Sequence, residues 1–178
     1  MLYCITKCIL FFIFNFFFRI EIQGKENIPR SGAFILASNH SSFLDPPILS
    51  VGSFRRRLNF LAKEELFFNN IFGWYIRKLG AIPLSREKTD ISAIKECIKR
   101  IKRGQPIVIF PEGTRNRQGE IKEGLPGIAL LAAKTNIPVI PAYIKGADCA
   151  LDANLKSLRF CRIYLKFGKP LMFYRQGP

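Results

Sequence analysis

Residues 33–47 read AFILASNHSSFLDPP, and this stretch sets the fold that the sequence predicts. Its first six residues form a short apolar run of the kind that fills a central strand, and the run ends two residues before His40. Pro46 and Pro47 favour the first turn of a helix, where a missing N–H is tolerated, and Asp45 is placed as the N-cap. The stretch therefore predicts His40 at a strand end and Asp45 at a helix start.

The rest of the chain alternates strand-like and helix-like segments. The expected strands are 58–62, 81–84, 106–110, 139–144 and 161–167, and the expected helices include 65–79 and 127–135. A further amphipathic helix begins at Asp90 and is closed by Gly104. This alternation predicts an α/β fold, and 178 residues suffice for one domain but not for two of ordinary size.

The N-terminus carries a strongly hydrophobic run. Residues 9–18 read ILFFIFNFFF, with Lys7 and Arg19 as flanking charges. A helix over this run covers ~15 Å at ~1.5 Å per residue, about half of the ~30 Å core of a bilayer. We expect segment 1–21 to dip into one leaflet of a membrane, with Lys7 and Arg19 at the headgroups. A helix that spans the membrane over 2–22 is the longer alternative.

Two other interpretations of this segment are disfavoured. A secretory signal peptide would need a small-x-small cleavage site after the apolar run, and none follows. A core helix of a soluble domain would need a polar face towards water, and the run has none.

The charge balance limits the classes of partner. There are 28 basic and 13 acidic residues, a net charge of +15, which favours nucleic acid, anionic lipid or phosphorylated substrates. The aromatic residues lie in apolar stretches and do not alternate with basic residues as stacking platforms would, so we expect lipid and no nucleic acid. A non-enzymatic basic protein that binds nucleic acid or membrane remains the alternative, supported by charge alone. The five cysteines form no metal-binding pattern and favour a reducing, cytosol-facing compartment.

His40 is the only histidine, so any imidazole-based proton transfer must use it. Asp45 follows five positions later across a turn. If its carboxylate reaches Nδ1 of His40, it fixes the tautomer and leaves Nε2 as the base. The alternatives are a surface or capping role for His40 and a helix N-cap for Asp45. Both roles of Asp45 are compatible, with one oxygen accepting from a backbone N–H and the other from the imidazole.

A second candidate site follows the predicted strand 106–110. The loop 111–115 reads PEGTR and combines a glycine, backbone N–H groups, a hydroxyl and a guanidinium, a set that can bind phosphate. Arg86 and Lys122 follow other strand ends or loops and can converge on the same anion. A solvated surface charge is the alternative for each of these two.

Four stretches resemble the motifs of the glycerolipid acyltransferases. NHSSFLD at 39–45 resembles the family motif N-H-x-x-x-x-D, and FPEGTR at 110–115 resembles F-P-E-G-T-R. GAIPLSR at 80–86 looks like the second family block and IPVIP at 137–141 looks like the fourth. The best-fitting branch is 1-acylglycerol-3-phosphate acyltransferase, also called lysophosphatidic acid acyltransferase.

The resemblance covers about 22–170 and implies one acyltransferase domain at 22–178, with a mixed central sheet flanked by helices. It implies that His40 is the general base and Asp45 its partner. It further implies a substrate site, with Arg86 on phosphate, formed by Arg86, Glu112, Gly113, Thr114, Arg115 and Lys122. The sequence departs from the pattern where Ile121 replaces an aromatic residue and Asn116 a serine. Family members usually carry a further C-terminal segment, so a naturally short or a truncated copy is expected.

The implied reaction moves a fatty acyl group from acyl-CoA or acyl-ACP to the sn-2 hydroxyl of lysophosphatidic acid, giving phosphatidic acid in phospholipid biosynthesis. The alternative acceptors are another lysophospholipid or a lyso-aminolipid. Neither a metal nor a cofactor is implied beyond the thioester co-substrate. The implied partners are the two substrates, a membrane surface and acyl carrier protein where it carries the donor. The implied location is the cytoplasmic face of a membrane, the cell inner membrane if the source is bacterial.

Overall fold

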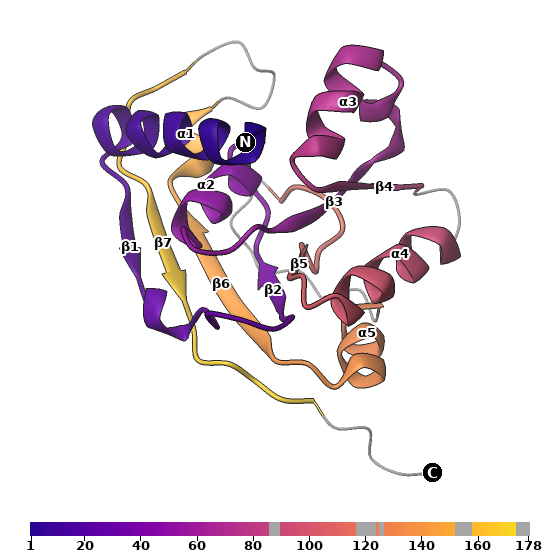
Figure 1. Ribbon diagram of the computed structural model, residues 1–178. Coiled ribbons are helices and arrows are strands. Elements are labelled where there is room, and N and C mark those ends of the chain that lie inside the picture. The colour runs from indigo at the N-terminus through magenta and orange to yellow at the C-terminus, as the bar shows by residue number, and fades with distance from the viewer. Residues whose placement is uncertain (86–89, 117–123, 125–126, 152–157, 174–178) are drawn as a thin grey trace.

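The centre of the molecule is a mixed β-sheet, shown in a computed structural model that describes residues 1–85, 90–116, 124, 127–151 and 158–173 (Figure 1). Within these residues the sheet has seven strands in the order β1-β7-β6-β2-β5-β3-β4. The strands are β1 (Glu21–Gln23), β2 (Ile35–Ser38), β3 (Asn59–Lys63), β4 (Ala81–Leu84), β5 (Ile107–Ile109), β6 (Val139–Lys145) and β7 (Tyr164–Phe167). Strands β6 and β7 pair antiparallel, and the other described pairs are parallel. The expected α/β fold with a mixed sheet is confirmed.

Helices cover both faces of the sheet. The described helices are α1 (Leu2–Phe18), α2 (Asp45–Gly52), α3 (Asn70–Lys78), α4 (Ile91–Lys102), α5 (Gly127–Thr135) and α6 (Ala147–Ala150), with 3-10 turns η1 (Lys25–Asn27) and η2 (Glu64–Phe67). Side chains alternate along a strand, so the neighbours Ile35 and Leu36 of β2 enter different cores. Leu36 packs in a core with residues of α1 and α2, and Ile35 packs in one with residues of α4 and α5.

Two predicted elements differ from the structure. The helix expected over 65–79 is divided into η2 and α3, because the side chain of Asn69 accepts the N–H of Phe72 (2.9 Å) and so caps a new helix. The strand expected over 161–167 begins only at Tyr164. Strand β1 was not predicted, and its three residues pair with β7 at one edge of the sheet.

Helix α1 packs on the domain through one side (Figure 1). Phe14 and Phe18 are buried in the same core as residues of α2 and β7. Lys7 is also buried, and its ammonium group donates to the backbone oxygens of Ser53 (2.9 Å) and Arg56 (3.0 Å). The expectation that Lys7 lies at lipid headgroups is therefore wrong, because Lys7 satisfies carbonyl groups at and beyond the end of α2.

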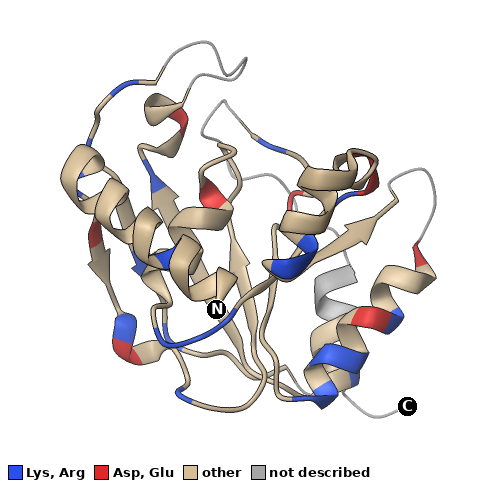
Figure 2. Ribbon diagram, turned by 45° about the horizontal axis from the view of Figure 1, so that its top comes forward, with Lys and Arg blue, Asp and Glu red and all other residues tan. Residues whose placement is uncertain are grey.

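The opposite side of α1 is exposed and apolar, and α1 has no Asp or Glu (Figure 2). Its exposed large apolar residues are Ile5, Ile9, Phe11, Phe12, Ile13, Phe16 and Phe17. The helix ends at Phe18 and Ile22 belongs to β1, so the alternative helix over 2–22 is not formed. No helix in the described part of the chain has both the length and the hydropathy required to cross a bilayer.

The burial of Lys7 predicts an alkaline rise in stability. Removal from water lowers the pKa of Lys7 from 10.5 to about 8. Between these two pH values the unfolded chain binds a proton that the folded protein has lost, so the free energy of unfolding should rise with pH, by roughly 2 kcal/mol from this group. The raised pKa values of Cys97 and Tyr3 act in the opposite direction over this range, so the measurement is a difference between proteins: in denaturant unfolding at pH 8 and at pH 10.5, the Lys7→Met variant should lack the contribution to the rise that Lys7 makes in the parent. The matched exposed variant, Lys134→Met, should retain it, and an equal rise in all three proteins would contradict the assignment.

Candidate active site

The two candidate loops meet at one edge of the sheet. Strands β2 and β5 are parallel neighbours, so the segments that follow them leave at the same edge. His40 follows β2, and loop 111–115 follows β5. The backbone N–H of Asn116 donates to the carbonyl oxygen of His40 over 2.7 Å, which joins the two loops directly.

His40 and Asp45 form a hydrogen-bonded pair. Nδ1 of His40 lies 2.8 Å from Oδ2 of Asp45, and the exposed fractions of the two side chains are 15% and 0%. The same carboxylate oxygen accepts the backbone N–H groups of Ser41 (2.7 Å) and Ser42 (2.8 Å). Three donors on one oxygen hold the negative charge of Asp45 in place in a buried position.

The N-cap role expected for Asp45 is wrong. Helix α2 begins at Asp45 itself, with Leu44 at the cap position and no capping side chain. The carboxylate folds back towards the preceding loop, where the Ser41 and Ser42 N–H groups and His40 bind it. The predicted division of the two oxygens also fails: all three donors contact Oδ2, and Oδ1 is buried without a hydrogen-bond partner among the described residues.

The pair leaves the other ring nitrogen of His40 as the basic one. An ionised carboxylate only accepts hydrogen bonds, so Nδ1 must carry the proton that faces Asp45. No described residue forms a hydrogen bond with Nε2. The ring of Phe110 stacks on the imidazole with centroids 4.0 Å apart and an interplanar angle of 18°. His40 is thus held in one orientation by a charge at its edge and an aromatic face beside it.

Asn39 anchors the start of the loop that carries His40. Its side-chain amide donates to the backbone oxygen of Ile144 (2.9 Å) and accepts the N–H of the same residue (2.8 Å). These two bonds continue the pairing of β2 with β6 beyond the last paired residue of β2, Ser38. The position of His40 relative to the sheet is therefore determined on both sides, by Asn39 before it and by Asp45 after it.

The PEGTR loop, which holds four of the predicted site residues, leads into Asn116 and its bond to His40. Gly113 has a φ of 66°, which favours glycine, and its N–H closes a turn onto the oxygen of Phe110 (3.0 Å). Glu112 is half-buried, and its Oε2 has no hydrogen-bond partner among the described residues. Thr114 is exposed.

Arg115 contacts the loop that connects His40 and Asp45. Its guanidinium lies 3.7 Å from the ring centroid of Phe43. Phe43 stands between His40 and Asp45 in the chain, so a planar cation is stacked over the loop that carries the proton-transfer pair. Arg86 and Lys122, which the sequence also assigns to the site, lie outside the described residues.

Three contributors were not predicted as site residues: Asn39, Phe110 and Asn116. Asn39 and Phe110 belong to the quoted motifs, but their effect depends on contacts with β6 and with the imidazole across the sheet edge. The backbone bond of Asn116 carries no side-chain signal in the sequence. Each of them positions His40 through tertiary contacts.

Together these groups form a site for base-assisted attack by a hydroxyl. A neutral imidazole backed by a buried carboxylate can accept a proton at Nε2, and the resulting imidazolium is stabilised by Asp45. A guanidinium nearby can hold an anionic group of the same substrate.

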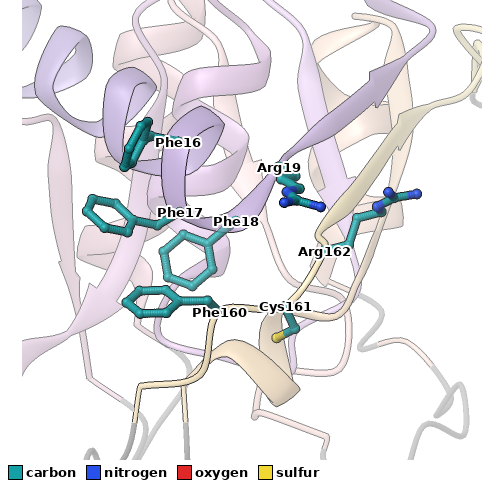
Figure 3. A pocket seen from close by; sticks show the side chains of 7 residues that line it. All are labelled: Phe16, Phe17, Phe18, Arg19, Phe160, Cys161 and Arg162. Atoms are coloured by element: carbon teal, nitrogen blue, oxygen red, sulfur yellow. The ribbon is translucent and has the colours of Figure 1, made fainter.

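A separate pocket of about 420 Å³ lies at the C-terminal end of α1 (Figure 3). It is lined by Phe16, Phe17, Phe18, Arg19, Phe160, Cys161 and Arg162, with the four phenylalanines on one side and the two arginines on the other. Phe17 and Phe160 stack at 5.2 Å, and Arg162 forms an ion pair with Glu21 (3.5 Å). None of the lining residues belongs to the proton-transfer pair or to the PEGTR loop.

Comparison with known proteins identifies a matching family model. Residues 19–145 match the family described as Acyltransferase. This range contains both motifs and all the candidate site residues.

Named relatives are similar over most of this chain. A chloroplastic 1-acyl-sn-glycerol-3-phosphate acyltransferase of Brassica napus, BAT2, is 35% identical over 133 residues, 73% of this chain and 38% of its own length. The 1-acyl-sn-glycerol-3-phosphate acyltransferase of Bacillus subtilis is 33% identical over 153 residues, 85% of this chain and 73% of its own length. The chain thus spans less than half of the plant relative and about three quarters of the bacterial one.

A solved structure is similar in fold. The crystal structure of the 1-acyl-sn-glycerophosphate acyltransferase PlsC from Thermotoga maritima matches with a TM-score of 0.81 and 29% identity. The match covers 99% of this chain and 70% of that chain.

Proposed function

The chain belongs to the Acyltransferase family, and on this premise we propose that it transfers a fatty acyl group to the sn-2 hydroxyl of 1-acyl-sn-glycerol-3-phosphate, giving phosphatidic acid. The observation that carries the proposal is the hydrogen bond between His40 and the buried carboxylate of Asp45, set beside the guanidinium of Arg115. The names of the relatives support a lysophosphatidic acid acceptor. The donor is an acyl thioester, carried by coenzyme A or by acyl carrier protein.

The reaction begins with proton removal by His40. Nε2 takes the proton of the acceptor hydroxyl as its oxygen attacks the thioester carbonyl, and a tetrahedral oxyanion forms. The C–S bond then breaks, the new ester remains on the glycerol, and the thiolate leaves with the electron pair. A thiol has a pKa of ~8.5 and leaves far more readily than an alkoxide, so the donor supplies the driving force. The proton on His40 passes to the thiolate and restores the base.

Asp45 stabilises the imidazolium that appears during attack. Its charge lies 2.8 Å from Nδ1 and is buried, so bulk water screens it little. The two serine N–H groups keep the carboxylate aligned before substrate arrives, so no reorganisation is needed when His40 becomes charged.

Arg115 holds the acceptor phosphate in this scheme, together with Arg86. Lys122 is proposed to bind the same phosphate. The stacking of the Arg115 guanidinium on Phe43 orders the side chain. Binding the phosphate at one end of the glycerol turns the encounter of hydroxyl and base into an oriented one. Glu112 adds a buried acceptor that a substrate hydroxyl can satisfy.

Replacement of Arg115 by alanine should mainly raise the KM for the acceptor. A charge-assisted hydrogen bond contributes about 1.5–3 kcal/mol, so we expect an increase of about 10- to 100-fold, with kcat less affected. Arg115→Lys should recover only part of the loss, because an ammonium group cannot contact phosphate through two parallel N–H bonds. Arg159→Ala, a matched change of an exposed arginine, should leave KM unchanged. An unchanged KM in Arg115→Ala would remove Arg115 from the phosphate site.

We further propose that the protein works at the cytoplasmic face of a membrane, where its lipid acceptor and product reside. The exposed apolar side of α1 and the exposed Arg19 after its end support contact with a membrane, and the cysteine pattern of the sequence favours its cytosol-facing side. In this arrangement α1 lies in the interface plane, with Phe14 and Phe18 holding it to the domain.

Product analysis tests the proposed reaction. Vesicles that contain radiolabelled lysophosphatidic acid are mixed with the protein and one acyl donor, acyl-CoA in one reaction and acyl-ACP in another. We expect labelled phosphatidic acid with at least one donor, and the productive donor identifies the co-substrate. Lysophosphatidylcholine serves as a matched acceptor whose phosphate carries a choline ester. Preferential acylation of lysophosphatidylcholine would contradict the proposal. A failure to acylate either acceptor would contradict it as well.

A further inference from the structure

Helix α3 and the turn η2 expose a second group of large apolar side chains. Ile71 is 83% exposed, Phe68 74% and Trp74 56%, and Leu66 and Phe72 are also exposed. Three of these five residues belong to α3 itself, and a helix of nine residues that leaves three large apolar groups in water is unusual for a soluble surface. Gly73 is the buried residue of α3, and it faces the backbone of Phe67, so the large side chains are turned outwards.

The apolar side of α3 adjoins α1. Ile71 and Phe72 precede Tyr75 by four and three residues and therefore share its side of the helix. The hydroxyl of Tyr75 lies 3.0 Å from that of Thr6 on α1, within hydrogen-bond distance. This contact places α3 next to α1.

The two helices also flank the active-site edge of the sheet. In the strand order, β2 and β5 occupy the middle, α2 with its partner α1 packs towards β7, and α3 packs beside β4. Helix α3 follows the carboxyl end of β3 through η2, so it starts at the same edge as the loop of His40. Figure 1 shows α1 and α3 at this end of the molecule, beyond the carboxyl ends of β2 and β6.

The charges around these helices match an anionic lipid surface. Neither α1 nor α3 contains Asp or Glu, whereas the turn η2 before α3 carries Glu64 and Glu65, and the last turn of α3 carries the exposed residues Arg77 and Lys78 (Figure 2). Arg55 and Arg57 are exposed in the segment after α2, next to the exposed Phe54 that contacts Phe11 of α1. Basic groups at the border of an apolar surface, with a tryptophan among them, are the arrangement of an interfacial membrane-binding element.

The geometry points to α3, with Phe68 before it, as a second membrane-inserting element, which enters the same anionic bilayer as the apolar side of α1. This inference rests on the proposed function, because a lipid acceptor gives both helices a reason to meet the bilayer. The active-site edge would then face the lipid between two inserted helices, so that lysophosphatidic acid reaches His40 from the membrane plane.

Trp74 reports on this insertion by itself, because it is the only tryptophan of the chain. Its fluorescence is measured with vesicles of phosphatidylcholine and phosphatidylglycerol, with and without brominated acyl chains. We expect a blue shift on binding and quenching by the brominated lipid, both reduced when phosphatidylglycerol is omitted or salt is raised. Protein that sediments with the vesicles while Trp74 stays unquenched would overturn the inference. Protein that does not sediment at all would overturn both this insertion and the placement of α1.

Paired variants identify the side chains involved. Phe68→Ser with Ile71→Ser should weaken partitioning into these vesicles by about tenfold per side chain, because each loses the apolar area it would bury in lipid. Ile91→Ser changes an isoleucine on α4 that is 62% exposed and should leave partitioning unchanged. Equal partitioning of all three proteins would overturn the inference. A blue shift that appears without lipid and grows with protein concentration would also overturn it, because it indicates that α3 binds a second copy of the protein.

The same vesicles separate this inference from the proposed function. Quenching of Trp74 without acylation of any lysolipid contradicts the proposed reaction and leaves the insertion of α3 standing. Acylation of lysophosphatidic acid without quenching contradicts the insertion and leaves the reaction standing.

Discussion

Replacement of His40 by alanine should lower kcat for acyl transfer by about 10²–10⁴-fold, the contribution of a positioned general base. His40 is the only imidazole of the chain, and its Nε2 is the basic atom at the meeting point of the two loops. The acceptor hydroxyl would then have to lose its proton to water during attack. Initial rates with saturating lysophosphatidic acid and thioester measure the effect.

Thermal unfolding and vesicle sedimentation provide the controls for this variant. The imidazole is partly exposed, and Asp45 keeps the Ser41 and Ser42 N–H groups, so we expect the fold and the membrane binding to persist. A folded, membrane-bound His40→Ala protein that retains nearly full acyl transfer would show that another group is the base.

Replacement of Asp45 by asparagine should produce a second large loss, again of about 10²–10⁴-fold in kcat. If the amide oxygen takes the place of Oδ2, the three hydrogen bonds persist, but the charge that stabilises imidazolium is gone and a buried NH₂ group lacks an acceptor. If the NH₂ group takes that place, it faces two N–H donors and reverses the tautomer of His40. Both orientations harm catalysis.

The stability of this variant distinguishes the structural role of Asp45 from its electrostatic one. An unsatisfied buried polar group is expected to lower the free energy of unfolding by about 1–3 kcal/mol. The matched change Asp148→Asn, at an exposed carboxylate, should alter neither kcat nor stability. Because His40 and Asp45 act as one unit, the double variant should be little slower than the more severe single variant. Multiplication of the two losses would indicate independent roles.

The fold was predictable where local sequence determines it. The apolar runs of β2, β5 and the first two residues of β6 are largely buried on both faces of the sheet, so their composition alone distinguishes them from the amphipathic helix α4. The His40–Asp45 pair was predictable for the same reason, because five positions and one turn bring the two side chains together. The place of both motifs at one edge followed from parallel strand ends.

The remaining features depend on contacts between distant segments. The burial of Lys7 requires the carbonyl groups after α2, some fifty residues away, and the hydrophobicity of α1 gives no sign of them. Aspartate is a common N-cap residue, so the sequence at Asp45 predicts a helix cap. Only the path of the preceding loop shows that its carboxylate turns towards the serine N–H groups. The stacking of Arg115 on Phe43 likewise arises from the approach of two loops.

A crystal structure with lysophosphatidic acid bound, in the absence of an acyl donor, tests the central claim most directly. The proposed mechanism predicts the sn-2 hydroxyl within about 2.6–3.2 Å of Nε2 of His40, with the phosphate in contact with Arg115. A bound acceptor whose hydroxyl lies beyond the reach of Nε2, or whose phosphate is held away from Arg115, would contradict it.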